Sequence, residues 1–187
     1  MVLQQVAVDI ETTGFDVDDV VTVVGFAVPL GLRVFVYDPD GDRDDAGLET
    51  TVRDRVEEHV QVSMHASEPA LFQAIQGFVE ERFRGEDVLL VAYNGERYRG
   101  GFDLPFLRTR AAMLGVEWPF RGVPFADLLP VVTRRFNTTL GGDEQSDLPG
   151  VYAVLCNGGL NEADPFEDSD EAVQAFADGR FVELVVH

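Results

Sequence analysis

One stretch near the N-terminus decides most of the fold, VAVDIETTGF at residues 6–15. Its first half is a valine-rich apolar run, which predicts a β-strand, and its Thr-Thr-Gly predicts a turn at the end of that strand. Asp9 and Glu11 are two residues apart, so their side chains would point to the same face of the strand.

Two carboxylates this close repel each other, and each favours protonation of the other. A divalent cation between Asp9 and Glu11 would remove that penalty, and hard oxygen ligands suit Mg²⁺ or Mn²⁺. The alternative is a solvated strand end without a ligand, because acidic residues are common there. The pair is therefore the first candidate for a metal site.

Outward from this stretch, strands are predicted before helices. Runs rich in valine and phenylalanine predict strands at residues 20–30, 31–38 and 87–94, and residues 59–66 form either a strand or a helix end. Apolar residues at helical spacing predict helices at 67–83 (capped by Ser67), 103–115 (ended by Gly115), 125–136, 146–159 and 169–187. Residues 141–147 are expected to be a flexible loop.

This order predicts one α/β domain over residues 1–187, with about five strands in a mixed sheet and helices on both faces. The chain holds 34 acidic and 14 basic residues, for a net charge of -20, and every basic residue is arginine because lysine is absent. Such a surface is typical of proteins from high-salt cytoplasm. Fourteen phenylalanines argue against a disordered acidic protein.

The charge also bears on partners and location. Nucleic acid would be repelled at low salt, so a nuclease of this composition needs concentrated salt, metal ions or a local arginine patch. The N-terminus lacks the basic region of a signal peptide, and no apolar run is long enough to span a membrane, so we expect a cytoplasmic protein without a membrane partner. No protein partner is evident. The single cysteine, Cys156, excludes an intramolecular disulfide and is expected to be buried.

An acidic stretch at residues 38–49 has the spacing of an EF-hand loop. Arg43 occupies the position that needs glycine, and the stretch follows a strand, so a solvated acidic loop is favoured over a calcium site. The carboxylates at loop positions one, three, five, seven and twelve are Asp38, Asp40, Asp42, Asp44 and Glu49.

Asp103 is the second candidate site residue. It follows the predicted strand that ends at Asn94 and begins the next predicted helix, a place where clefts form in α/β sheets. A helix N-cap is the alternative role for this aspartate.

The two segments, VAVDIETTGF and YNG…GFDLPFL, together resemble the DEDD superfamily of 3′–5′ exonucleases. The likeness is greatest to its ribonuclease H-like, predicted-exonuclease branch, which includes the proofreading domains of family-B polymerases. The resemblance implies a ribonuclease H-like fold, two bound Mg²⁺ or Mn²⁺ ions and the 3′ end of a nucleic acid as partner. It also implies roles for individual residues: Asp9 bridging two metals, Glu11 and Asp103 as metal ligands, Thr12 and Thr13 beside the 3′-terminal nucleotide, Asn94 in the second motif and Phe102 near the terminal base or sugar.

The chain departs from the family pattern in its second motif. Nine residues separate Asn94 from Asp103, where the family has four or five, so ERYRG looks like an insertion. Arg97 and Arg99 within it either contact phosphates or are solvated loop residues.

The third motif also differs. In the family it is Tyr or His followed three to five residues later by Asp, on a C-terminal helix. FVELVVH ends at His187, which would then be the general base, with its aspartate beyond a truncated end. The alternative is that His187 is a frayed terminal residue. Asp127 is expected to be structural or a helix cap, and no convincing Tyr or His accompanies the other stand-ins, Asp168, Asp170 and Glu183.

The sequence therefore predicts a metal-dependent 3′–5′ exonuclease that hydrolyses DNA or RNA to mononucleotides. A catalytically impaired nuclease-fold protein that binds nucleic acid or another partner is the alternative. The missing fourth carboxylate and the acidic surface motivate it.

Overall fold

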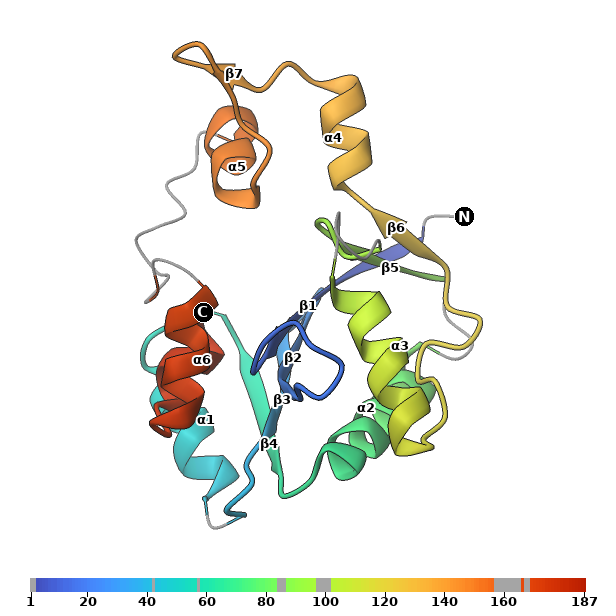
Figure 1. Ribbon diagram of the computed structural model, residues 1–187, viewed down its shortest axis with the longest axis vertical. Coiled ribbons are helices and arrows are strands. Elements are labelled where there is room, and N and C mark those ends of the chain that lie inside the picture. The colour runs from blue at the N-terminus through green and yellow to red at the C-terminus, as the bar shows by residue number, and fades with distance from the viewer. Residues whose placement is uncertain are drawn as a thin grey trace.

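A six-stranded mixed sheet organises the protein (Figure 1). This computed structural model describes residues 3–41, 43–56, 58–83, 87–96, 102–156, 166 and 169–187. The strand order is β4-β3-β2-β1-β5-β6, and β2 alone runs antiparallel to its neighbours. The strands are β1 (Gln4–Thr12), β2 (Val21–Val28), β3 (Gly31–Tyr37), β4 (Val60–His65), β5 (Val88–Ala92) and β6 (Phe125–Asp127).

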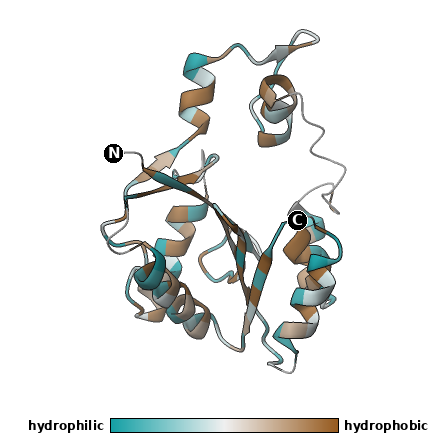
Figure 2. Ribbon diagram, turned by 180° about the vertical axis from the view of Figure 1, so that it is seen from behind, coloured by the Kyte–Doolittle hydropathy of each residue, from teal (hydrophilic) through white to brown (hydrophobic). Residues whose placement is uncertain are grey.

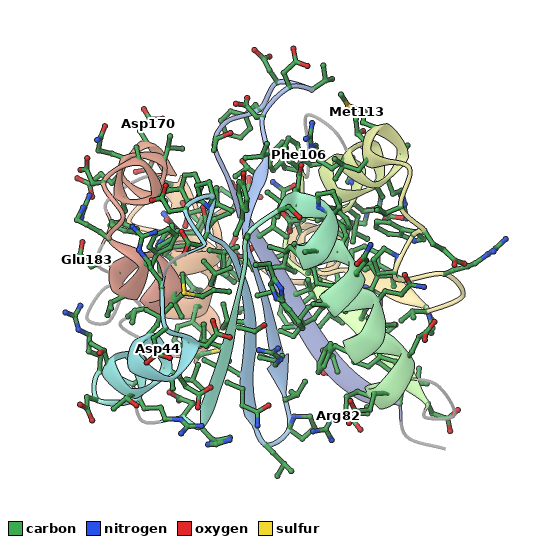
Figure 3. The ribbon with its side chains drawn as sticks, turned by 90° about the horizontal axis from the view of Figure 1, so that it is seen from below. Asp44, Arg82, Phe106, Met113, Asp170 and Glu183 are labelled. Atoms are coloured by element: carbon green, nitrogen blue, oxygen red, sulfur yellow. The ribbon has the colours of Figure 1, made fainter. Side chains whose placement is uncertain are left out.

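Helices cover both faces of this sheet. Figure 3 shows α2 and α3 on one side of the strands and α1 and α6 on the other. Beyond β6, the chain continues into a separate arm of α4, a β7–β8 hairpin and α5 (Figure 1). None of the described helices has the length and apolar character needed to cross a membrane. The helices are α1 (Asp45–Arg53), α2 (Glu68–Arg82), α3 (Asp103–Leu114), α4 (Leu129–Arg135), α5 (Leu148–Cys156), α6 (Ser169–Ala177) and α7 (Phe181–Val186). The hairpin strands are β7 (Thr139–Leu140) and β8 (Asp143–Glu144).

Two hydrophobic clusters hold the layers together. One lies between the sheet and the helices α2 and α3, and the other between the sheet and the helices α1, α6 and α7. Figure 2 shows hydrophobic residues over much of α5 and interspersed with hydrophilic residues along the strands. In β1, Val6, Val8 and Ile10 point into the first cluster, so the alternate residues face the other side of the sheet.

Side chains of α1 close the free edge of β4. An edge strand exposes unpaired backbone groups that invite pairing with other chains. Residues four apart on a helix advance about 6 Å, close to the spacing of alternate strand residues, so a helix can satisfy such an edge. Three bonds of 2.9–3.0 Å do so here: Asp45 accepts from the Met64 N–H, Glu49 accepts from the Val62 N–H, and the Arg53 Nε donates to the Val60 carbonyl.

Several predicted elements are confirmed. The four strands at the N-terminal side and β5 lie where the valine-rich runs predict them, with residues 59–66 forming a strand. The hydroxyl of Ser67 caps α2 by accepting from the Ala70 N–H, and Gly115 ends α3 in the left-handed conformation at φ 67°.

Other predicted elements are wrong in detail. The sheet has six strands rather than five, because residues 125–127 pair with β5 instead of beginning a helix. Residues 139–144 form a hairpin, where a flexible loop was expected from 141 onward. The helix predicted at 169–187 is two helices, separated at Gly179 with φ 70°.

Candidate functional site

The carboxylates of β1 lie side by side, as the strand spacing predicts. Asp9 and Glu11 face away from the cluster under α2 and α3. Asp9 is opposite Gly25 in β2, and no atom lies within 4 Å of the place where a Cβ on that glycine would be. The space beside Asp9 is therefore open. The β1–β2 ladder ends in an irregularity between Glu11 and Thr12.

A cavity of about 390 Å³ opens over this part of the sheet. Asp9, Glu11 and His187 line it together with apolar side chains from the sheet, from α7 and from the arm, among them Leu148. The cavity thus places charged groups within a mostly apolar cleft, as is usual for ligand sites.

Asp103 is the first residue of α3, and Phe102 at the N-cap makes no side-chain cap hydrogen bond. The N–H groups of Phe102 and Leu104 instead donate to the carbonyls of Asn94 and Gly95, at 3.1 and 2.9 Å. The capping role considered for Asp103 is thus performed by the preceding loop. Asp103 itself is only 8% exposed.

The pKa of Asp103 is raised to about 8. Burial is the main cause, and the negative charges of Asp9, Glu11 and Asp127 add to it. Carboxylates from β1 and from the start of α3 therefore lie within electrostatic reach of one another, although more than 90 residues separate them in the chain.

The pKa of Asp9 is also raised, chiefly by burial. The charge of His187 and a backbone hydrogen bond from Ile10 act in the opposite direction. Asp9 is nevertheless a solvent-exposed residue, and it lines the cavity. The rise in pKa thus reflects the protein around the cavity, not complete enclosure of the carboxylate.

His187 joins the same site from the end of α7. Its Nε2 lies 3.4 Å from Oε1 of Glu11, and its ring centroid lies 5.0 Å from that of Phe166. The structure thus places Asp9, Glu11 and His187 on one cavity, and Asp103 is linked to the two carboxylates of β1 through the electrostatic effect on its pKa. An imidazole beside a carboxylate can accept a proton and can be oriented by that carboxylate.

An aromatic surface borders the carboxylates. The rings of Phe15 and Phe102 meet edge to face with centroids 5.0 Å apart, and Phe102 packs on Phe106 at 4.7 Å. Phe15 is 64% exposed and was missed in the sequence. Its position directly after the predicted Thr-Thr-Gly turn, where burial is not expected, was the signal that could have identified Phe15 as an exposed aromatic residue.

The threonines of the first motif shape the loop that carries Phe15. The hydroxyl of Thr12 donates to the Gly14 carbonyl at 2.7 Å, and that of Thr13 donates to Asp19 at 3.0 Å. The Val20 N–H donates to the Thr13 hydroxyl at 3.0 Å. Thr12 and Thr13 therefore affect the site by holding this loop in place.

A buried ion pair between Arg110 and Glu68 also holds this loop in place. Arg110 on α3 donates to both carboxylate oxygens of Glu68 on α2, at 2.9 and 2.5 Å, and to the Val17 carbonyl at 2.8 Å. Glu68 also accepts from the Val21 N–H at 3.1 Å. The pair ties β2 and the loop before it to both helices.

Some predicted site residues cannot be placed here or are used elsewhere. Arg97, Arg99 and Asp168 lie outside the described residues, as does Asp42 of the acidic stretch. Glu183 pairs with Arg180. Cys156 is exposed, so the expectation that it is buried is wrong.

The described carboxylates of the acidic stretch serve local structure. Asp38 pairs with Arg43 at 2.5 Å, Asp44 caps α1, and Glu49 bonds to β4. α1 begins at Asp45, inside what would be the calcium loop. The calcium alternative therefore has no support in this geometry.

Among the described residues, no three His, Cys, Asp or Glu side chains form a group arranged to hold a metal ion. The coupling of Asp103 to Asp9 and Glu11 is thus electrostatic and not a ready coordination sphere.

No protein-family model matches this chain, and no curated protein matches it in sequence.

Proposed function

We propose that this chain is a metal-dependent 3′–5′ exonuclease with a ribonuclease H-like fold, acting on DNA or RNA. One observation carries the proposal: burial, with the charges of Asp9 and Glu11 added to it, raises the pKa of Asp103 at the start of α3. Two carboxylates of β1, which line the cavity, thus interact electrostatically with a third carboxylate from a distant part of the chain. Such concentrations of perturbed acids are typical of functional sites.

The donor set is suited to hard divalent cations, because all its atoms are carboxylate oxygens. Asp9, Glu11 and Asp103 would hold Mg²⁺ or Mn²⁺, with two ions expected in the complete site. Bound ions would offset the repulsion among these carboxylates and lower the pKa of the attacking water.

His187 would take the proton of that water. Its Nε2 is 3.4 Å from Oε1 of Glu11, so the carboxylate can hold the ring in place. The apolar side chains that line the cavity lower the local dielectric constant, so ionic interactions there are stronger than in bulk water.

The aromatic surface of Phe15 and Phe102 would receive the terminal base of the strand. Stacking of a base on an aromatic side chain contributes about 1–3 kcal/mol and tolerates any base. This mode of binding suits a chain with a net charge of -20, because it does not depend on neutralising phosphates. Arg97 and Arg99 remain predicted phosphate contacts.

The direct test is an incubation with a single strand labelled at its 5′ end, in Mn²⁺ and molar KCl. We expect stepwise shortening from the 3′ end, abolished by Asp9→Ala. Asp143→Ala is the matched control, because Asp143 is an exposed carboxylate on β8.

Binding of the strand without cleavage would favour the alternative, a catalytically impaired nucleic-acid-binding protein. Cleavage that persists in Asp9→Ala would mean that the activity does not come from this site. Internal cleavage without 3′ shortening would reject the exonuclease proposal.

A further inference from the structure

Asp127 ends β6 beside Ala92 of β5, and its carboxylate holds two segments of the chain. One oxygen accepts from the N–H groups of Asn94 and Leu129, at 2.9 and 3.0 Å, and the other accepts from the Glu96 N–H at 3.1 Å. The residue is 9% exposed. Of its three bonds, only the one to Leu129 belongs to its own helix start.

The other two bonds fix the loop that leads from β5 toward α3. Asn94 has φ 61°, a left-handed conformation that asparagine adopts more readily than most residues with a side chain. Asp127 holds this loop by its N–H groups, while the N–H groups of Phe102 and Leu104 hold the carbonyls of Asn94 and the next residue.

Gly95, between the two residues whose N–H groups Asp127 accepts, packs directly against Asp103. A Cβ at that glycine would lie 2.9 Å from Oδ2 of Asp103 and 2.6 Å from the Cβ of Ala92. The loop is thus pressed between the end of β5 and the carboxylate of Asp103. A shift of the loop must move that carboxylate.

We propose that Asp127 is a positioning residue, which sets the place of the Asp103 carboxylate opposite Asp9 and Glu11 through the loop at residues 94–96. The inference deepens the proposed function and rests on it for its catalytic consequence. A carboxylate that served only to start α4 would need the bond to Leu129 alone.

The variants are Asp127→Asn, which keeps the shape and one acceptor oxygen, and Asp127→Ala, which removes all three bonds. The matched control is Asp44→Asn, because Asp44 also accepts two backbone N–H groups at a helix start, at 3.2 and 3.1 Å. Figure 3 shows Asp44 on α1, across the sheet from α3.

Two measurements separate positioning from general stability. In the nuclease assay, we expect kcat of Asp127→Asn to fall about 10- to 100-fold, as for groups that orient a metal ligand, with KM changed less than about threefold. In amide hydrogen exchange of the free protein, we expect residues 93–96 and 102–104 to exchange about 5- to 10-fold faster. Asp44→Asn should leave both unchanged.

Unchanged kcat in Asp127→Asn, or exchange rates equal to those of the parent, would overturn the inference. An equal loss of kcat in Asp44→Asn would show that the effect is general destabilisation. Should the parent protein not cleave, the proposed function fails, and hydrogen exchange alone then decides whether Asp127 holds the loop. If Asp127→Ala does not fold, Asp127→Asn carries the test.

Discussion

Replacing Asp103 by asparagine should make the protein more stable at pH 8 and leave its stability at pH 4 unchanged. The pKa of this carboxyl is raised from 3.8 to about 8 on folding, so the unfolded chain releases the proton more readily. Between these pH values the folded state binds more protons, and its free energy of unfolding therefore falls as pH rises. Each pH unit costs about 1.4 kcal/mol, so the loss at pH 8 is at most about 6 kcal/mol.

Movement of the side chain toward water reduces such a penalty, and we expect Asp103→Asn to gain about 2–4 kcal/mol at pH 8. The assay is urea unfolding in molar KCl with a chelator, at pH 4, 6 and 8, because urea leaves the ionic strength unchanged. Asp143→Asn, at an exposed position, is the control. A variant less stable than the parent at pH 8, or a gain equal at all pH values, would refute the raised pKa of Asp103.

Three other changes test other parts of the structure. Glu68→Ala leaves the buried guanidinium of Arg110 without its partner, so we expect a loss of about 3–5 kcal/mol in urea unfolding, and a loss below about 1 kcal/mol would contradict the role of the pair. Glu49→Ala frees the Val62 N–H at the edge of β4, so we expect concentration-dependent self-association in light scattering, and a strictly monomeric variant would show that the edge needs no such closure. Gly95→Ala forces a Cβ against Asp103, so we expect kcat to fall at least about tenfold at nearly unchanged KM, whereas parent-like kcat would mean that the loop yields freely.

The sequence predicts the parts of the fold that depend on local patterns. Valine-rich alternation gives β1, and the same alternation places Asp9 and Glu11 on one face. Ser67 and Gly115 mark helix ends through backbone chemistry that needs no distant partner.

What the sequence could not give depends on contacts between distant segments. β6 is three residues long and exists only because it pairs with β5 at the edge of the sheet. The start of α1 lies in an acidic stretch without helical patterning, and its role becomes visible only when its side chains meet β4.

The site shows the same division. Its proposed members, Asp9, Glu11, Asp103 and His187, were predicted from motifs because they occur in recognisable segments. The part played by Asp127 was not, since an aspartate before a predicted helix is most simply a cap. Only the register of β5 and β6 shows that its carboxylate reaches back to the loop before α3.

Anomalous scattering from crystals grown with Mn²⁺ tests most directly whether these carboxylates form one site. We predict a peak bound by Asp9 and Asp103 together, with Asp103 drawn toward β1. A saturating soak that gives no peak at these residues, or a peak only at the acidic stretch around α1, would contradict the account.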